Sequence, residues 1–285
     1  MNSDIVIFHL GFGSGGIPTL DGVLNQFPRN CILYGFDAQE SSQEDRKSMQ
    51  MYEDRGVRTK LVTKCISGHS GQQAFYVNKE PSSSSLLPPA SQALSEDPRY
   101  SWTRSWGTNT ELNYTVELDA ISLGDFIQEE GVIPDLLSMD VQGMEYAIME
   151  SASNFFDDIG AVFSEVEFFE IYEGQGLFSH QLDFLRKHDI RLADIVHMQY
   201  WHPHKADRGA GFLTVGEALW LRTIDSLDIS DKSLIKTIKQ AAIGFAYNRT
   251  SYASAILNRL SESHMKSKIK EVCVSNGFGD LTVLF

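Results

Sequence analysis

Apolar residues along the chain gather in short runs that alternate with segments of helical spacing. The runs expected to form core strands lie at residues 5–10, 31–36, 61–66, 134–137, 161–168, 190–197 and 213–221. Helical spacing is found between them, at about 18–27, 41–55, 146–149 and 179–188. A parallel strand that is covered on both faces has a continuous apolar run rather than a strict alternation. The pattern therefore predicts an α/β fold with a mostly parallel sheet.

One long segment interrupts this alternation. Residues 74–77 and 114–118 are expected to form additional strands, and residues 78–113 between them have no clear period. A loop of this length inside a compact domain is usually a lid, a binding loop or disordered. Trp102 and Trp106 favour a partly ordered lid, because disordered tracts are poor in aromatic residues.

Helical spacing returns at the end of the chain, over residues 224–285, and carries no chemical motif. We therefore predict one domain at residues 1–223, with the lid as an insertion, and a helical C-terminal extension at residues 224–285. The apolar face of the extension can be buried against its own domain or against a second copy, so a homodimer stays open.

Composition and charge narrow the class of protein. With 285 residues, 42% of them hydrophobic, the chain can bury a large core. The net charge of −14 argues against a nucleic-acid partner, which needs clustered cations. No apolar run reaches the length of a membrane span, and Asp4 precedes the first strand where a signal peptide would be apolar. Three scattered cysteines without metal spacing are expected to be buried thiols. A cytoplasmic location is the resulting prediction.

The first strand leads into a glycine-rich turn. Gly11, Gly13 and Gly16 satisfy G-x-G-x-x-G, and Asp37 ends the next strand, at about the distance expected of a ribose-binding acid. A nicotinamide dinucleotide would bring a pyrophosphate to this turn, whereas S-adenosylmethionine (SAM) would bring a sulfonium. No Lys or Arg occurs over residues 5–28, which favours the sulfonium cofactor.

A second strand-to-helix turn, Ser138–Glu145, follows the predicted strand at 134–137. Ligands of an open parallel sheet bind outside the carboxyl ends of its strands, so Asp140 is expected at the mouth of the crevice. Gly143 allows a close backbone approach, and Glu145 lies in the first helical turn, where the helix dipole favours an anion.

These motifs, in this order, resemble the FkbM family of SAM-dependent methyltransferases. The segments that carry the likeness are His9–Gly15, Gly35–Ala38, Cys65–Gly71, Ser84–Leu86, Leu123–Phe126, Ser138–Glu145, Glu165 and Glu217–Leu221. The resemblance implies a Rossmann-like, class I methyltransferase sheet of seven strands with an antiparallel last strand. It also implies SAM as cofactor and methyl transfer to a hydroxyl of a sugar, a glycan or a secondary metabolite.

The same resemblance, with the predicted strand ends, selects the candidate site residues. The cofactor-binding candidates are His9, Gly11, Gly13, Gly15, Asp37, Ser67 and Asp140. An alcohol oxygen needs a group that takes its proton as it attacks. Asp140, Glu165 and His197 are the catalytic candidates, because all three end predicted strands at one edge of the sheet.

Two alternatives stay open. His9, Asp37 and Gln142 stand where the family has Asp, Glu and Glu, and His9 and Gln142 keep open a degenerate methyltransferase that serves as a binding module. An NAD(P)-dependent oxidoreductase would use the same glycine turn, but the chain has no Tyr-x-x-x-Lys pair.

No metal site is predicted from the sequence. His197, His202, His204 and Asp207 have irregular spacing and are expected to be surface residues of a loop. A divalent ion held by Asp140 and Glu165 stays a less favoured possibility.

Overall fold

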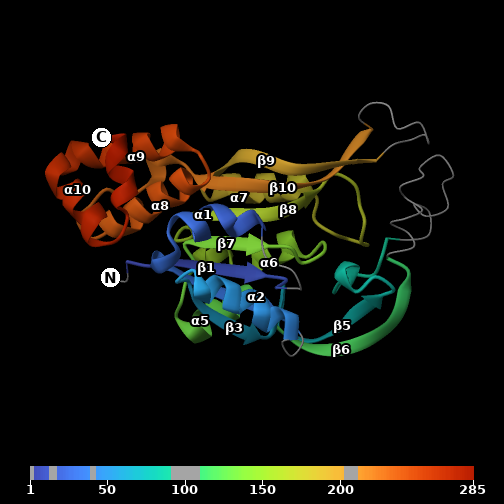
Figure 1. Ribbon diagram of the computed structural model, residues 1–285. Coiled ribbons are helices and arrows are strands. Elements are labelled where there is room, and N and C mark those ends of the chain that lie inside the picture. Colours follow the sequence, from blue (N-terminus) through green and yellow to red (C-terminus); the bar gives the residue numbers. More distant parts are fainter. Residues whose placement is uncertain (1–2, 13–17, 39–42, 91–109, 202–210) are drawn as a thin grey trace.

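The computed structural model describes residues 3–12, 18–38, 43–90, 110–201 and 211–285. Its centre is a seven-stranded sheet in the order β3-β2-β1-β7-β8-β10-β9 (Figure 1). The strands are β1 (Ile5–Leu10), β2 (Cys31–Asp37), β3 (Arg58–Thr63), β7 (Leu136–Met139), β8 (Ala161–Glu167), β9 (Ile190–Trp201) and β10 (Phe212–Arg222). In this sheet β10 is antiparallel to both β8 and β9, and the other neighbouring strands pair in parallel. The predicted mostly parallel α/β fold with an antiparallel last strand is confirmed.

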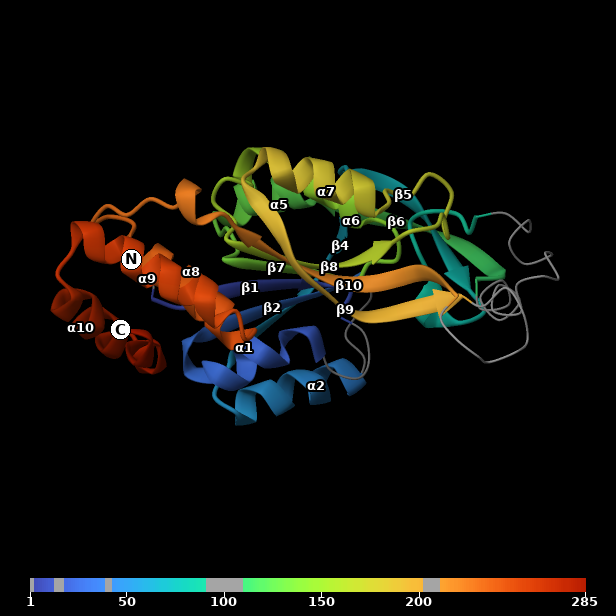
Figure 2. The same cartoon turned by 90° about the horizontal axis from the view of Figure 1, so that it is seen from above.

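Helices cover both faces of the sheet, as Figure 2 shows. One face carries α1 (Asp21–Gln26) and α2 (Gln43–Asp54), and the other carries α5 (Leu123–Glu130), α6 (Glu145–Ser151) and α7 (Phe178–Lys187). Successive side chains of a strand point to opposite faces. In β1, Ile5 and Ile7 therefore join the first core, while Phe8 and Leu10 join the second.

The C-terminal extension is helical and lies at the amino ends of the parallel strands (Figure 1). It consists of α8 (Leu234–Ala246), α9 (Thr250–Ser263) and α10 (Lys266–Ser275). Ile238, Ile256 and Leu260 are fully buried in the same core cluster as Ile5 and Ile7. The extension therefore buries its apolar face against its own chain. Short 3-10 helices are found at Pro18–Leu20, Pro28–Asn30, Pro81–Ser83, Ser153–Phe155, Ile224–Ser226 and Gly279–Leu284.

The run predicted as one core strand at residues 61–66 is divided between two strands: its first half belongs to β3 of the main sheet, and only its second half was assigned to the wrong sheet. The chain leaves the main sheet after β3, and β4 (Cys65–Ser67) pairs instead with β6 (Leu112–Ser122) in a separate sheet of order β4-β6-β5, where β5 is Gly71–Asn78. At the break, the Lys64 N–H donates to the Val62 carbonyl across a tight turn. An apolar run does not reveal which partner strand it pairs with, so this change of partner leaves no trace in the pattern.

The predicted lid is described at residues 78–90, which fold back onto the main domain, and at residues 110–113, which lead into β6. Ser85 pairs with Tyr76, and Pro89 pairs with Tyr172 in the loop after β8. Residues 91–109, with Tyr100, Trp102 and Trp106, lie outside the described residues. Within the described part of the chain, no helix combines the length and the apolar character that a membrane crossing needs.

Candidate active site

The two strand-to-helix turns meet at the carboxyl end of the sheet. The Asp140 N–H donates to the Leu10 carbonyl at 3.1 Å. Gly11 has a φ of +86°, and a Cβ on it would overlap the Asp140 carbonyl oxygen. Only glycine therefore permits this approach. The predicted cofactor-binding residues Gly13 and Gly15 lie outside the described residues.

His9 lies beneath these turns as a buried, uncharged side chain. It is 5% exposed, and its Nδ1 lies 2.9 Å from the Oγ of Ser138, its partner in register on β7. Loss of hydration on burial lowers the pKa of His9 to about 3. Where the family pattern has a carboxylate, this chain thus has a neutral ring that can form hydrogen bonds but no ion pair.

Asp37 and Ser67 differ in what their side chains can reach. Asp37 is half-buried at the end of β2. Ser67 is completely buried, and its hydroxyl donates to Oε1 of Gln73 at 2.9 Å. The Ser67 hydroxyl is therefore already engaged within the protein.

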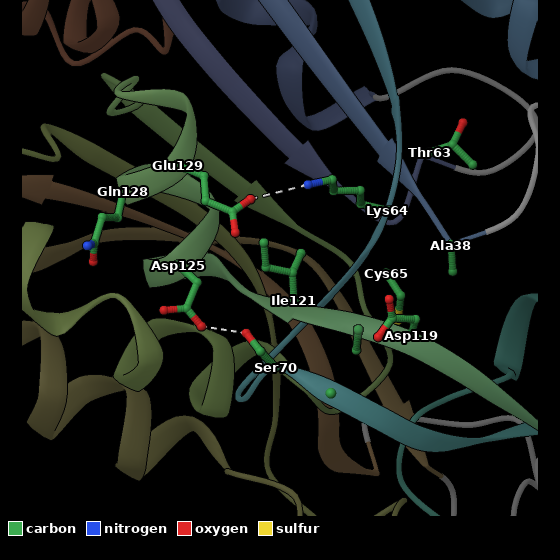
Figure 3. A pocket seen from close by; sticks show the side chains of 12 residues that line it. Ala38, Thr63, Lys64, Cys65, Ser70, Asp119, Ile121, Asp125, Gln128 and Glu129 are labelled. Carbon is green, nitrogen blue, oxygen red and sulfur yellow. Dashed lines mark hydrogen bonds and ion pairs between the residues drawn. The ribbon is translucent and has the colours of Figure 1, made fainter.

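A pocket of about 880 Å³ opens beside this edge, between the end of β3 and α5 (Figure 3). Ala38, directly after Asp37, lines it together with Thr63, Cys65 and Asp119. Lys64 and Glu129 form an ion pair of 3.5 Å at its rim. None of the predicted catalytic residues lines this pocket.

The predicted acids gather at the ends of β7 and β8. Glu165 and Glu167 lie two residues apart on β8 and so share one face. Glu145 begins α6 and accepts a hydrogen bond from the Val141 N–H at 2.8 Å. One carboxylate oxygen from each of these three glutamates lies within 4.8 Å of the others. We call Glu145, Glu165 and Glu167 the glutamate cluster.

Burial raises the pKa of Asp140, Glu217 and all three members of the glutamate cluster, and repulsion by neighbouring carboxylates adds to the rise for all of them except Asp140. Desolvation is the largest cause for Glu145, whose pKa rises to about 7. The pKa values of Glu165 and Glu167 are raised further, first by desolvation and then by neighbouring carboxylates. Glu217, opposite Glu165 on β10, also has a pKa raised to about 7, by desolvation and by Asp140. Glu217 was not among the predicted site residues.

Asp140 itself is exposed at the mouth of this acidic region. Its pKa is nevertheless raised, because the surrounding protein removes much of the hydration of its carboxylate. The amide of Gln142 partly offsets this rise, since Nε2 donates to Oδ1 of Asp140 at 2.9 Å. The same Nε2 lies 3.5 Å from Oε2 of Glu165. Gln142 therefore links the two leading catalytic candidates.

Tyr172 fixes the orientation of that amide. Its hydroxyl lies 2.8 Å from Oε1 of Gln142 and 2.8 Å from the Ser83 carbonyl, and its proton serves both acceptors. Because Oε1 faces Tyr172, the NH2 group of Gln142 faces the carboxylates. The Ser85 hydroxyl donates to the Gln142 carbonyl at 2.7 Å. The sequence identified Gln142 only as a departure from the family pattern, and it gave no signal for Tyr172.

His197 lies in a different setting from the acids. It is exposed on β9, in an irregularity of the pairing with β10, and has a φ of +50°. No hydrogen bond or ion pair of the described residues joins its ring to Asp140 or Glu165. His202, His204 and Asp207 lie outside the described residues.

A known family matches more than half of this chain. A model of the FkbM methyltransferase domain matches residues 21–192. Similar solved structures include magnesium protoporphyrin IX methyltransferase (ChlM) of Synechocystis PCC 6803 with bound SAM, with 11% identity over 77% of this chain and 71% of that one and a TM-score of 0.37. TYW2 of M. jannaschii in complex with AdoMet has 12% identity over 78% and 71%, and a TM-score of 0.31. No curated protein matches the chain.

Proposed function

The chain belongs to the FkbM methyltransferase family, and from this premise we propose that it is a SAM-dependent O-methyltransferase. Its acceptor would be a hydroxyl of a sugar, a glycan or a secondary metabolite. The observation that carries the proposal is the pair Asp140 and Glu165, joined through the Gln142 amide at the carboxyl edge of the sheet. So many acids at one edge favour an uncharged or cationic acceptor over an anionic one.

The residues of the first two strand ends suit this cofactor. When bound, SAM supplies an electrophilic methyl group on a sulfonium sulfur. Gly11 lets the first turn approach without a side chain, and the Asp37 carboxylate, at the end of β2, would accept hydrogen bonds from ribose hydroxyls. The negative charge of Asp140 and its neighbours favours a cationic sulfonium nearby.

Asp140 and Glu165 would handle the proton of the acceptor hydroxyl. As the hydroxyl oxygen forms its bond to the methyl carbon, its proton passes to a carboxylate oxygen of one of them. A carboxylate whose pKa is raised towards neutrality is the better proton acceptor, and desolvation raises the pKa of both. Gln142 holds the two carboxylates in place, so their contribution includes alignment as well as basicity.

Calorimetric titration of the purified protein with S-adenosylhomocysteine tests the cofactor, with NAD and NADP titrated in parallel. We expect micromolar binding of S-adenosylhomocysteine and no dinucleotide signal. The Asp37→Ala variant should lose most of this affinity, and unchanged affinity would contradict the cofactor assignment. Dinucleotide binding would favour the oxidoreductase alternative.

A screen of hydroxyl acceptors for S-adenosylhomocysteine release then tests the reaction. Glu165→Gln should lower the turnover of any acceptor found, while Glu150→Gln, an exposed acid at the end of α6, serves as the matched control. Cofactor binding with no release from any hydroxyl acceptor would favour the binding-module alternative.

A further inference from the structure

The glutamate cluster is unusual because it is buried and incompletely bonded. Glu145 is 0% and Glu167 is 1% exposed. The Oε2 atom of each is buried and has no hydrogen-bond partner in the described part of the chain. An unpaired buried carboxylate is costly, so both atoms need either a proton or a cation.

The surrounding charges increase this cost. The groups that act most strongly on Glu165 are Asp140, Glu167, Glu145 and Glu217, all of them acids. For Glu167 they are Glu145 and Asp140. Each ionised carboxylate disfavours the ionisation of its neighbours, and no Lys or Arg is among the described groups that act most strongly on Glu165 and Glu167. Its own backbone N–H and the Gln175 side chain offset part of this effect for Glu167.

The burial also limits what can enter. Neither Oε2 atom of Glu145 and Glu167 is open to solvent, so a cation that binds both of them must lose most of its hydration. A small ion meets this condition more easily than a charged group carried by a larger molecule. Glu165 is only partly buried, so an ion would be reached by water or by an acceptor from its side.

The distances fit a metal. Two oxygens bound to one Ca²⁺ are at most about 5 Å apart, and two bound to one Mg²⁺ at most about 4 Å. The three oxygens here lie within 4.8 Å of one another, so a Ca²⁺-sized ion would need at most a slight contraction of the cluster and a smaller ion a larger one. Carboxylate oxygens are the ligands that such hard cations prefer.

We propose that Glu145, Glu165 and Glu167 bind a divalent cation of the Mg²⁺, Mn²⁺ or Ca²⁺ class. This differs from the possibility raised by the sequence, because Asp140 is not one of the three ligands and is hydrogen-bonded to Gln142. Only the use of the ion rests on the proposed function: on the Glu165 side it would bind the acceptor hydroxyl and lower its pKa, and Asp140 would then be the acid that takes the proton.

Binding is measured on the full chain after treatment with EDTA, by titration with MnCl2 and electron paramagnetic resonance of the free ion. We expect one Mn²⁺ per chain with micromolar affinity. Glu167→Gln and Glu165→Gln keep the side-chain size and should each weaken binding at least about tenfold. Glu217→Gln removes a neighbouring carboxylate outside the three ligands and should weaken it by no more than about threefold.

Two results would overturn the inference. One is a wild-type protein that binds no Mn²⁺ or Ca²⁺ at millimolar concentration, a measurement that depends on no variant. The other is a Glu167→Gln variant that keeps its fold, by circular dichroism, and binds Mn²⁺ as the wild type does. In both cases the buried carboxylates would be held by protons instead.

A parallel titration separates this inference from the proposed function. S-adenosylhomocysteine binding is measured in EDTA and again in saturating Mn²⁺. Intact cofactor binding without any metal binding contradicts the metal site alone. Metal binding without cofactor binding contradicts the cofactor assignment and leaves the metal site standing.

Discussion

The buried acids near the two ends of β7 differ in whether their carboxylate oxygens have partners within the protein. At the amino end, Asp135 accepts hydrogen bonds from the Val6 N–H at 2.8 Å and from Nζ of Lys239 at 3.0 Å. The side chains of this pair are only 15% and 10% exposed. At the carboxyl end, Glu145 and Glu167 are more deeply buried, and each has an oxygen without a partner.

This contrast separates a structural acid from candidate functional ones. Asp135 and Lys239 satisfy each other, and the pair ties α8 to the sheet. In the glutamate cluster, the Oε2 atoms of Glu145 and Glu167 have no such partner among the described residues. Acids with strongly perturbed pKa values concentrate where a protein binds a ligand or catalyses a reaction. Near the amino end of β7 the buried acid is therefore paired within the protein, whereas near its carboxyl end the buried acids require a ligand or a proton.

The largest expected effect comes from removing the ion pair between Lys239 and Asp135. Lys239→Met leaves Asp135 buried without its cation and should lower the free energy of unfolding by about 4 kcal/mol. Urea denaturation measures this loss. The matched control is Lys236→Met, whose partner Asp158 is exposed, and which should cost less than about 1 kcal/mol. Equal losses in the two variants would remove the contrast.

A second test concerns the close contact between the Gly11 backbone and the Asp140 carbonyl. Gly11→Ala forces a Cβ against the Asp140 carbonyl at a left-handed φ, and should cost about 3 kcal/mol of stability together with S-adenosylhomocysteine affinity. Gly131→Ala is the control, since its φ is +66° but nothing lies within 4 Å. It should cost about 1 kcal/mol and leave affinity unchanged. Equal effects would show that strain alone, and not the contact, matters.

A third test concerns His9, a buried base whose lowered pKa makes stability depend on pH. Because its pKa falls to about 3 in the folded state, the unfolded chain binds a proton first as the pH drops below about 6.5. This side chain should therefore cost about 2 kcal/mol of stability at pH 5 and nothing above pH 7.5. Urea unfolding of wild type and His9→Asn at both pH values isolates the difference. A parallel pH dependence in the two proteins would contradict it.

The smallest expected effect has the opposite sign. Glu167→Gln removes a buried charge that has no partner, so at pH 8 the metal-free variant should be more stable by about 1 kcal/mol. Glu145→Gln should gain less, because Oε1 of Glu145 already accepts from the Val141 N–H. A clear loss of stability in Glu167→Gln would indicate a structural role for this carboxylate.

The sequence predicted the sheet well because buried parallel strands leave long apolar runs, and β1 begins and ends at the residues expected. It also predicted that Asp140 and Glu165 share an edge, since both end strands of one sheet. An apolar run does not show which strand it pairs with, so the sequence did not predict that Cys65–Ser67 belongs to a second sheet.

Contacts between distant segments account for the rest of the site. Ser67 was expected at the cofactor, but its hydroxyl bonds Gln73 on the next strand. Glu217 approaches Asp140 only because of the register of β10 on β8, which the alternation of residues does not specify. The orientation of the Gln142 amide depends on Tyr172, which lies in another loop of the chain.

The Tyr172 hydroxyl has an evolutionary consequence. One proton serves both the Ser83 carbonyl, in the inserted segment, and the Gln142 amide, beside the acids. Drift in the insertion that displaces Ser83 would therefore alter the alignment of Asp140 and Glu165. We expect positions 142 and 172, whose side chains are in contact, to covary among relatives, whereas position 83 contributes only its backbone carbonyl to this contact and need not covary with them.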